Sequence, residues 1–347
     1  MNKRICILGT GAWATALGIR LSLNGATVFM YGVDIFEVND INSGYNKKYF
    51  GEKKFISSLS ATTDLSTAIG DSKFIILAFP SNYLIEVLRK VRTIISRNSN
   101  VILINTIKGL DQVSHDVLSK TIKKELKGYK AKLVTLSGPS LASDVFDLKP
   151  TIINISGKHK ETVSSVIDLF NSNEFKIVPI NDFKGIQIYS SVKNLLAIGA
   201  GIVSEKYNSI SSVSALITLG LKEIMLICKH MGAKKSTLLS FCGVGDAFLS
   251  CFSNDSRNFN FGKLIYNHGI RKALTLNKKT VEGYQVYKVA KNIIFKYKLS
   301  CPVFSTLIEV LDEKTKADHF VEKCWSLISK FFLIRFLNFQ VYPRTRP

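Results

Sequence analysis

Apolar positions in the first half of the chain form two alternating patterns. Short apolar runs, as expected for strands buried on both faces, are separated by segments whose apolar residues recur at helical spacing. We expect strands at residues 5–8, 27–31, 74–78, 101–105, 132–137, 151–155 and 176–179, and helices between them, for example at 83–95 and 163–170. This alternation predicts a parallel sheet with helices on both faces.

The strand pattern stops at about residue 185, and longer apolar-periodic segments follow. We expect helices at 186–203, 213–231, 247–252, 261–267, 281–297 and 304–311, with Pro302 in the first turn of the last of them. The chain therefore divides into an α/β N-terminal domain at 1–182, an all-α C-terminal domain at 183–330 and an unassigned apolar and basic tail at 331–347. Residues 42–58 are the least regular stretch, and we expect a surface insertion there.

A glycine-rich turn at residues 9–14 joins the first predicted strand to a helical pattern. Gly9 allows a tight turn, Gly11 lets a pyrophosphate approach the backbone, and Ala14 is small enough for the helix to pack on the strand. The second strand ends near Asp34, where an acid bonds a ribose hydroxyl in dinucleotide-binding folds. A secretory signal is the alternative interpretation, but the two glycines weaken its apolar core.

Composition narrows the function classes. The chain has 347 residues, of which 46% are hydrophobic, and no uncharged apolar run reaches the length of a membrane span. Six scattered cysteines lack the spacing of a metal site or a disulfide framework, which indicates reduced core residues in the cytoplasm. The net charge of +21 is spread along the chain instead of forming a basic stripe, so we expect no nucleic-acid partner.

Two polar groups stand out in the apolar first part of the helical half. Lys193 and Asn194 lie in a segment whose other residues are small or apolar. There an ammonium must reach solvent or find hydrogen-bond acceptors. The structural interpretation is a snorkelling or salt-bridged lysine, and the functional one is a desolvated lysine with a lowered pKa that exchanges a proton with substrate.

Asp246 and the polar residues that follow it allow two interpretations as well. Asp246 follows a glycine-rich turn and is either the N-cap of a helix or a pocket residue together with Ser250, one helical turn later. The sequence Ser256-Arg257-Asn258 is either a turn before a capped helix or a phosphate site, because guanidinium, hydroxyl and amide groups suit phosphate oxygens.

Two loops directly follow predicted strands of the sheet. Residues 106–110 place Lys108 beside a glycine, and residues 137–142 combine glycine, proline and hydroxyl groups. Ligands bind at the carboxyl ends of strands in such sheets, so either loop is an ordinary turn or part of a cofactor site.

Together these motifs resemble the NAD(P)-dependent glycerol-3-phosphate dehydrogenases of bacterial type over about residues 4–318. The resemblance is carried by the glycine turn at 9–17, Pro80-Ser81, Lys108-Gly109-Leu110, Ser137-Gly138-Pro139-Ser140, Val192-Lys193-Asn194 with the glycine-containing 197–201, Gly243-Val244-Gly245-Asp246, Ser256-Arg257-Asn258 and Val281-Glu282-Gly283. It implies a Rossmann-type N-terminal domain, a helical C-terminal domain and reversible hydride transfer between a nicotinamide and dihydroxyacetone phosphate or sn-glycerol 3-phosphate, a phospholipid precursor.

The resemblance also implies roles for particular residues. Lys193 would exchange the proton with the substrate, and Asp246 would orient Lys193. The implied cofactor-binding residues are Gly9, Gly11, Ala12, Trp13, Asp34, Lys108, Ala142, Arg257 and Glu282. The implied substrate-binding residues are Lys108, Gly138, Ser140, Lys193, Asn194, Asp246, Ser256, Arg257 and Asn258.

The remaining expectations concern the cofactor and the assembly. Asp34 has no basic neighbour in sequence, which favours NAD, with NADP possible, because an acid repels a 2′-phosphate. No metal is required by this chemistry. We expect a cytoplasmic homodimer that acts on a phosphorylated triose and has no transmembrane segment. The alternatives are a related two-domain dehydrogenase of another hydroxy acid or phospho-sugar, and a catalytically decayed cofactor-binding protein.

Overall fold

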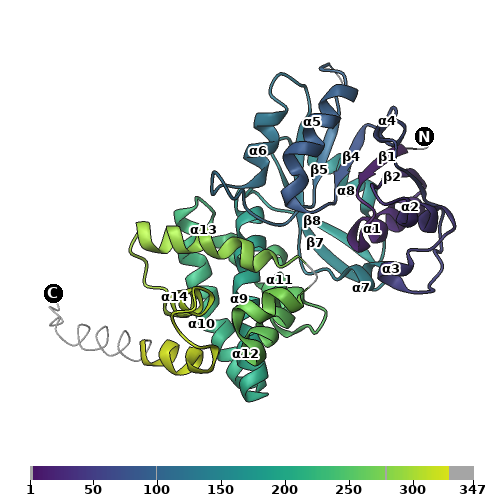
Figure 1. Cartoon of the computed structure of the whole chain (residues 1–347). Helices are drawn as coiled ribbons and strands as arrows, with labels where there is room; N and C mark the ends of the chain where they lie inside the picture. Colours follow the sequence, from purple (N-terminus) through teal and green to yellow (C-terminus); the bar gives the residue numbers. More distant parts are fainter. Residues whose placement is uncertain (1–2, 99, 278–279, 328–347) are drawn as a thin grey trace, which may run out of the picture. The chain divides into compact units, whose positions relative to one another are not determined.

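A computed structural model describes residues 3–98, 100–277 and 280–327 (Figure 1). The predicted tail at 331–347 lies outside the described residues. The strands are β1 (Lys3–Leu8), β2 (Ala26–Tyr31), β3 (Ser60–Thr62), β4 (Phe74–Leu77), β5 (Ile102–Asn105), β6 (Lys132–Ser137), β7 (Thr151–Gly157) and β8 (Phe175–Pro179). The helices of this half are α1 (Ala12–Leu23), α2 (Ile35–Asn42), α3 (Lys47–Phe50), α4 (Leu65–Ile69), α5 (Leu84–Ile94), α6 (Leu118–Glu125), α7 (Ala142–Phe146) and α8 (Lys160–Phe170).

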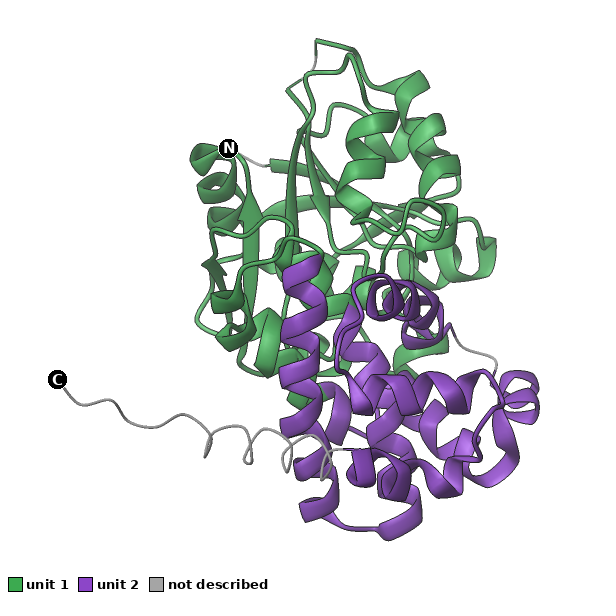
Figure 2. Cartoon of the chain, turned by 90° about the vertical axis from the view of Figure 1, so that its left-hand side faces the viewer, with its two compact units in different colours: residues 1–191, 231–249 green, residues 192–230, 250–347 purple. Residues whose placement is uncertain are grey.

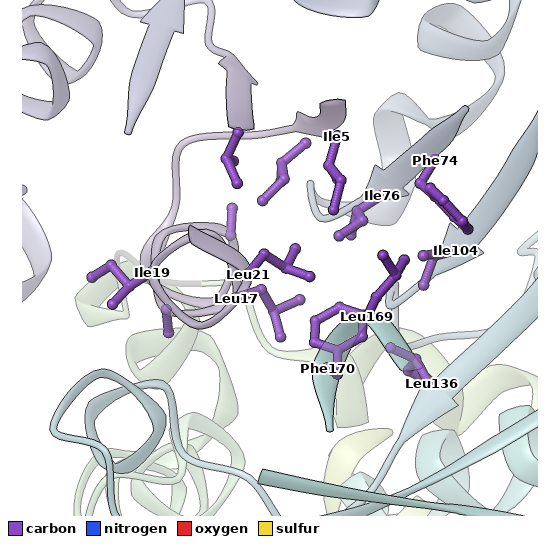
Figure 3. Close-up of a cluster of buried hydrophobic side chains, with 14 of the residues drawn as sticks. Ile5, Leu17, Ile19, Leu21, Phe74, Ile76, Ile104, Leu136, Leu169 and Phe170 are labelled. Carbon is purple, nitrogen blue, oxygen red and sulfur yellow. The ribbon is translucent and has the colours of Figure 1, made fainter. Parts of the chain in front are cut away.

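The strands form one eight-stranded sheet in the order β3-β2-β1-β4-β5-β6-β7-β8. Successive residues of β1 point to opposite faces, and both faces are buried. Ile5 and Ile7 pack with α1, α7 and α8, whereas Cys6 and Leu8 pack with α4, α5 and α6. Figure 3 shows Leu17 and Leu21 of α1 directed at this first core. The predicted arrangement of helices on both faces is therefore confirmed.

The sheet is not wholly parallel, which corrects one expectation. β7 pairs with β6 in antiparallel orientation, and β8 is parallel to β7. The link after β6 contains only the five-residue α7, which rises by about 7 Å, whereas the six residues of β6 span about 20 Å. Because α7 is too short to carry the chain back along β6, β7 starts from the end at which β6 stops.

The region at 42–58 is mostly exposed, as expected for a surface insertion, but two of its side chains reach the interior. Asn46 is fully buried, and Phe55 packs into the core beside α1. The short strand β3, which follows this region and pairs with β2, was not predicted. Its three residues are small and two of them are polar, so they lack the apolar run that marks the other strands.

The second half is helical, as predicted. Its long helices are α9 (Gly185–Tyr207), α10 (Ile210–His230), α12 (Arg257–Leu276), α13 (Glu282–Lys296) and α14 (Pro302–Leu311), and the short α11 (Asp246–Phe252) follows one π-helical turn at Phe241–Gly245. Pro302 occupies the first turn of α14, as expected from its fixed φ. All six cysteines are buried thiols, and burial raises the pKa of the Cys6 thiol to about 12.

The chain forms two compact units (Figure 2). Unit 1 comprises residues 1–191 and 231–249, and unit 2 comprises residues 192–230 and 250–347. The segment 231–249 belongs to unit 1 partly because the buried Asp182 binds it: one carboxylate oxygen accepts from Lys234 N at 2.8 Å and from Thr237 Oγ1 at 2.6 Å. The chain passes from one unit to the other within α9, directly after α10 and within α11.

Among the residues that the structure describes, two helices, α9 and α10, are long and apolar enough to cross a membrane by length and composition. The apolar window of α9 is completely buried inside the protein. The buried residues of α10 recur at helical spacing, and this helix packs against α13 and α14. Both are therefore core helices.

Glu223 joins α10 to the start of α14 inside unit 2. Its carboxylate oxygens accept hydrogen bonds from Val303 N at 2.8 Å and Phe304 N at 2.9 Å, and only 5% of the residue is exposed. These donors are among the first N–H groups of α14, which no carbonyl of the helix satisfies. Burial raises the pKa of the Glu223 carboxyl to about 7, against the opposing effect of the two hydrogen bonds.

We expect Glu223 to make stability depend on pH. Because the folded-state pKa is raised from 4.5 to about 7, its stabilising contribution is complete below pH 4.5 and is lost as the pH rises through 7. The loss is at most about 3 kcal/mol. Urea unfolding at about pH 5 and pH 8 measures the free energy of unfolding of Glu223→Gln and of the wild type. Relative to the wild type, the variant should be more stable at pH 8 than at pH 5 by up to this amount. Exposed Glu313→Gln is the control, and parallel pH profiles for Glu223→Gln and the wild type would disprove the effect.

Candidate active site

The glycine turn in unit 1 has the geometry that the sequence predicts. Gly9 has φ +124°, and a Cβ there would lie 2.3 Å from the carbonyl oxygen of Ala78 at the end of β4, so only glycine fits. Gly11 is the N-cap of α1 without a side-chain hydrogen bond, and a Cβ there would meet nothing closer than Tyr49 Oη at 4.0 Å. The first turn of α1 thus presents backbone N–H groups beside open space, which fits a dinucleotide phosphate.

Asp34 lies directly after β2 and is the N-cap of α2. Its Oδ1 accepts a hydrogen bond from Phe36 N at 2.9 Å. The sequence gives Asp34 no basic neighbour, but the fold provides one. Lys48 lies close enough for the charge of Asp34 to contribute to the raised pKa of the lysine, whose main cause is a hydrogen bond to Glu37.

Lys108 follows β5 and pairs with a carboxylate of the same unit. Its Nζ lies 3.1 Å from Asp246 Oδ2, with 30% of the lysine side chain exposed against 2% for the aspartate. The next residue, Gly109, has φ +130° and donates its N–H to Ser191 Oγ at 3.1 Å. The positive φ and this hydrogen bond fix the loop that carries Lys108.

The loop after β6 lies close against β7 because Gly138 has no side chain. A Cβ on Gly138 would lie 2.7 Å from Ile153 Cα of β7, so glycine is required for this contact. Ser140 Oγ donates to Gly138 O at 3.2 Å. Ala142 opens α7, and like Trp13 of α1 it packs at the margin of the core.

Asp246 is not an N-cap. The preceding residues already form the π-helical turn, and Asp246 itself has helical φ −70° and ψ −27°. A Cβ on Gly243 would lie 2.3 Å from Leu238 O, and Cys242 N donates to Asn154 Oδ1 of β7 at 2.8 Å, so the turn packs closely on other parts of unit 1. Single π-helical turns are frequent at functional sites. The turn places the Asp246 carboxylate in the interior with Lys108.

Lys193 is buried in α9, as the functional interpretation requires. Only 3% of the lysine and 1% of Asn194 are exposed. The ammonium donates a hydrogen bond to Ser250 Oγ, which belongs to the same unit. The snorkelling interpretation is therefore wrong, because the ammonium lies within the protein. The orientation of Lys193 by Asp246 stays a prediction.

The predicted phosphate-binding residues form one cluster in unit 2. Ser256 is the N-cap of α12, and its Oγ accepts from Phe259 N at 3.3 Å. Arg257 Nη2 lies 2.5 Å from Glu282 Oε1, and 46% of the arginine side chain is exposed. Asn258 Oδ1 accepts from Gly283 N at 2.8 Å, which leaves Nδ2 as the donor group of this amide.

Glycines set the distance between α9 and α12. A Cβ on Gly201 would lie 2.0 Å from Phe259 O, and one on Gly262 would lie 2.1 Å from Ile198 O. A Cβ on Gly283 would likewise lie 2.4 Å from Asn194 O. Main chain therefore contacts main chain, and this contact places the Lys193 helix beside the helix that starts with Arg257.

Unit 1 carries a glycine turn of the dinucleotide-binding type. Unit 2 carries a buried lysine and a cluster of hydrogen-bond donors that suit a phosphate. These features are those of an NAD(P)-dependent dehydrogenase of a phosphorylated substrate. Two family models agree. The N-terminus of NAD-dependent glycerol-3-phosphate dehydrogenase matches residues 4–163, and its C-terminus matches residues 182–322. The chain belongs to the NAD-dependent glycerol-3-phosphate dehydrogenase family.

Individual relatives are similar over nearly the whole chain. The glycerol-3-phosphate dehydrogenase [NAD(P)+] of Malacoplasma penetrans is 56% identical over 94% of this chain and 97% of its own, and that of Mesoplasma florum is 35% identical over 91% and 95%. The crystal structure of glycerol-3-phosphate dehydrogenase from Coxiella burnetii has a TM-score of 0.84 at 26% identity, covering 93% of this chain and 98% of its own. The predicted family, fold class, enzyme class and NAD(P) cofactor are confirmed.

Sequence reasoning missed several polar groups beside the predicted ones. Glu37, Asn46 and Lys48 surround the glycine turn, but they lie in segments without a motif and reach the turn only through the fold. The sequence predicts Ser250 only as a neighbour of Asp246 in a pocket. Its helical spacing was the signal, although the contact that the structure places there is with Lys193.

Proposed function

We propose that this chain interconverts dihydroxyacetone phosphate and sn-glycerol 3-phosphate with NAD(P). The observation that carries the proposal is the buried Lys193 ammonium in the same unit as the Ser256-Arg257-Asn258 donors. The bound nicotinamide supplies or accepts the hydride at C2. The product is the backbone of glycerophospholipids, in agreement with the family.

Lys193 is proposed as the proton donor in reduction and the acceptor in oxidation. When the ketone carbon gains hydride, its oxygen develops negative charge, and a positioned ammonium stabilises that charge and donates a proton. Burial and the bond to Ser250 support this role, because they hold the ammonium in one place away from bulk water. Asp246 is proposed to orient the lysine, and its burial as a carboxylate supports a role in the site.

Ser256, Arg257 and Asn258 are proposed to hold the substrate phosphate. The guanidinium presents several N–H donors, the serine hydroxyl has a hydrogen to donate, and Asn258 has its Nδ2 group, so the three match an acceptor-only ligand. Glu282 supports the assignment, because it fixes the guanidinium by an ion pair. Binding energy at the phosphate then orients the reacting carbon.

The remaining contacts follow the same division. Gly9, Gly11, Ala12, Trp13, Asp34, Lys108, Ala142, Arg257 and Glu282 are proposed for the cofactor. Lys108, Gly138, Ser140, Lys193, Asn194 and Asp246 are proposed for the substrate. We propose 1–182 and 183–330 as the functional domains.

A cytoplasmic homodimer is also proposed. Buried thiols support a reducing compartment, and the exposed Phe295 supplies apolar surface for a dimer contact. Light scattering tests the dimer.

Adding dihydroxyacetone phosphate to the purified protein with NADH should consume NADH at a rate proportional to protein concentration. A folded protein that binds NADH without turnover would support the decayed cofactor-binding alternative and contradict the proposal. Turnover only with another ketone from a panel of hydroxy-acid and phospho-sugar precursors would indicate the related dehydrogenase instead.

A further inference from the structure

The segment that contains α3 is attached to the glycine turn. Asn46 is completely buried, and its Nδ2 donates to Thr10 O and to Thr15 Oγ1, both at 2.8 Å. Thr10 lies between the two glycines of the turn, and Thr15 lies in the first turn of α1. This double hydrogen bond holds α3 beside the proposed cofactor site, and the side chains next to Asn46 are therefore close to it.

Lys48 is the charged side chain that this attachment brings to the turn. Its ammonium donates to Glu37 Oε1, and Glu37 Oε2 accepts from Thr10 Oγ1 at 2.6 Å. Glu37 is nearly buried, with 10% of its side chain exposed, whereas 57% of the Lys48 side chain is exposed. Lys48 thus faces solvent at the end of this chain of hydrogen bonds. The negative charge of Asp34 also contributes to the raised pKa of Lys48.

The position of these groups indicates which part of the cofactor they meet. In open parallel sheets the adenosine ribose lies beyond the carboxyl end of the second strand, here the end of β2, where Asp34 stands. Asp34 Oδ1 is occupied by Phe36 N, so its other oxygen remains to accept from a ribose hydroxyl. Glu37 and Lys48 form an ion pair nearby, and the charge of Asp34 acts on that lysine. A 2′-hydroxyl suits Asp34, whereas a 2′-phosphate needs the ammonium.

We propose that Lys48 determines whether this chain accepts the 2′-phosphate of NADP, by exchanging Glu37 for that phosphate. The inference rests on the proposed function only in requiring that the glycine turn binds the dinucleotide. Glu37 tolerates the exchange because Thr10 continues to donate to it. Asp34 opposes the phosphate by charge repulsion. Lys48 therefore contributes to NADP binding and little to NAD binding.

The test compares Lys48→Gln with Lys47→Gln. Lys47 is the neighbouring exposed lysine, 52% exposed and paired with Glu52 at 3.2 Å, so its removal is a matched control for charge. Dissociation constants for NADH and NADPH are measured by nucleotide fluorescence, and those for AMP and 2′,5′-ADP by calorimetry. Lys48→Gln should weaken NADPH and 2′,5′-ADP by about tenfold to a hundredfold, the value of a charged hydrogen bond, and change NADH and AMP less than about threefold.

Two further variants test the mechanism. Lys48→Arg should retain NADPH binding, because it keeps the charge. Asp34→Asn should tighten NADPH, since asparagine remains a good N-cap for α2 but no longer repels phosphate. Equal weakening of NADH and NADPH by Lys48→Gln, no change in either, an equal effect of Lys47→Gln, or a wild type that does not bind NADPH would each overturn the proposal.

The outcomes also separate this inference from the proposed function. If the wild type reduces dihydroxyacetone phosphate but Lys48→Gln leaves the ratio of the NADPH and NADH dissociation constants unchanged, only the inference fails. If the ratio changes as expected but the wild type reduces no dihydroxyacetone phosphate, only the proposed substrate fails. Thermal unfolding of each variant shows whether a loss of binding reflects loss of fold.

Discussion

Replacing Lys193 by methionine should lower kcat for dihydroxyacetone phosphate by about a thousandfold, within the range of general acid catalysis. Methionine fills much of the same space but provides neither the proton nor the positive charge for the developing alkoxide. Because Lys193 is buried in α9, an apolar side chain of similar length should leave the fold intact, although Ser250 loses this hydrogen bond. Steady-state kinetics with NADH measures the effect.

A matched control and a binding measurement make the Lys193 result specific. Lys229→Met removes an exposed lysine from the end of α10 in the same unit and should keep wild-type kcat. NADH affinity should be preserved in Lys193→Met, because the proposed loss lies in the chemical step. A Lys193→Met enzyme that keeps more than about a tenth of wild-type kcat would rule out this lysine as the proton donor.

Replacing Arg257 by glutamine should lower kcat/KM for dihydroxyacetone phosphate by about a hundredfold or more. Charged hydrogen bonds to phosphate are each worth about 1.5–3 kcal/mol, and glutamine retains none of the guanidinium charge. KM should rise, and kcat should fall as well, because energy from the phosphate contact is used to orient the reacting carbon. Arg257→Lys keeps the charge beside Glu282 but not the planar fork, so we expect an intermediate loss.

Dihydroxyacetone without phosphate separates anchoring from structural damage. At saturating NADH, the wild type should use this ketone poorly, and Arg257→Gln should use it as well as the wild type does, because this ketone has no phosphate for the arginine to bind. If Arg257→Gln lowers kcat/KM for both ketones by the same factor, Arg257 supports the fold or the cofactor and does not anchor the substrate phosphate.

The elements that could be predicted are those whose apolar pattern leaves one structural solution. The central strands are buried on both faces, so their runs are continuous and end close to the observed limits. Lys193 was recognisable because an ammonium in an apolar helix requires an explanation. Gly9 and Gly11 were recognisable because a tight turn and a bare backbone need glycine.

Other features depend on contacts between segments that are far apart in sequence. The direction of β7 is set by the length of α7 relative to β6. The apolar runs predict where strands lie but not in which direction each strand pairs. Asp246 pairs with Lys108, which follows β5 and lies 138 residues earlier in the sequence. Lys48 lies in an irregular segment, and only the buried hydrogen bonds of Asn46 bring it to the glycine turn.

The glycine contacts between α9 and α12 determine how this enzyme can change during evolution. At Gly201 and Gly262 the spacing of the two helices is set by main-chain atoms, so it does not depend on the size of the surrounding apolar side chains. Neighbouring core positions can therefore exchange side chains of similar volume, such as leucine and isoleucine, over generations while main-chain contacts keep the separation of Lys193 and Arg257. A lineage whose sequence diverges rapidly can keep a functional reaction centre in this way.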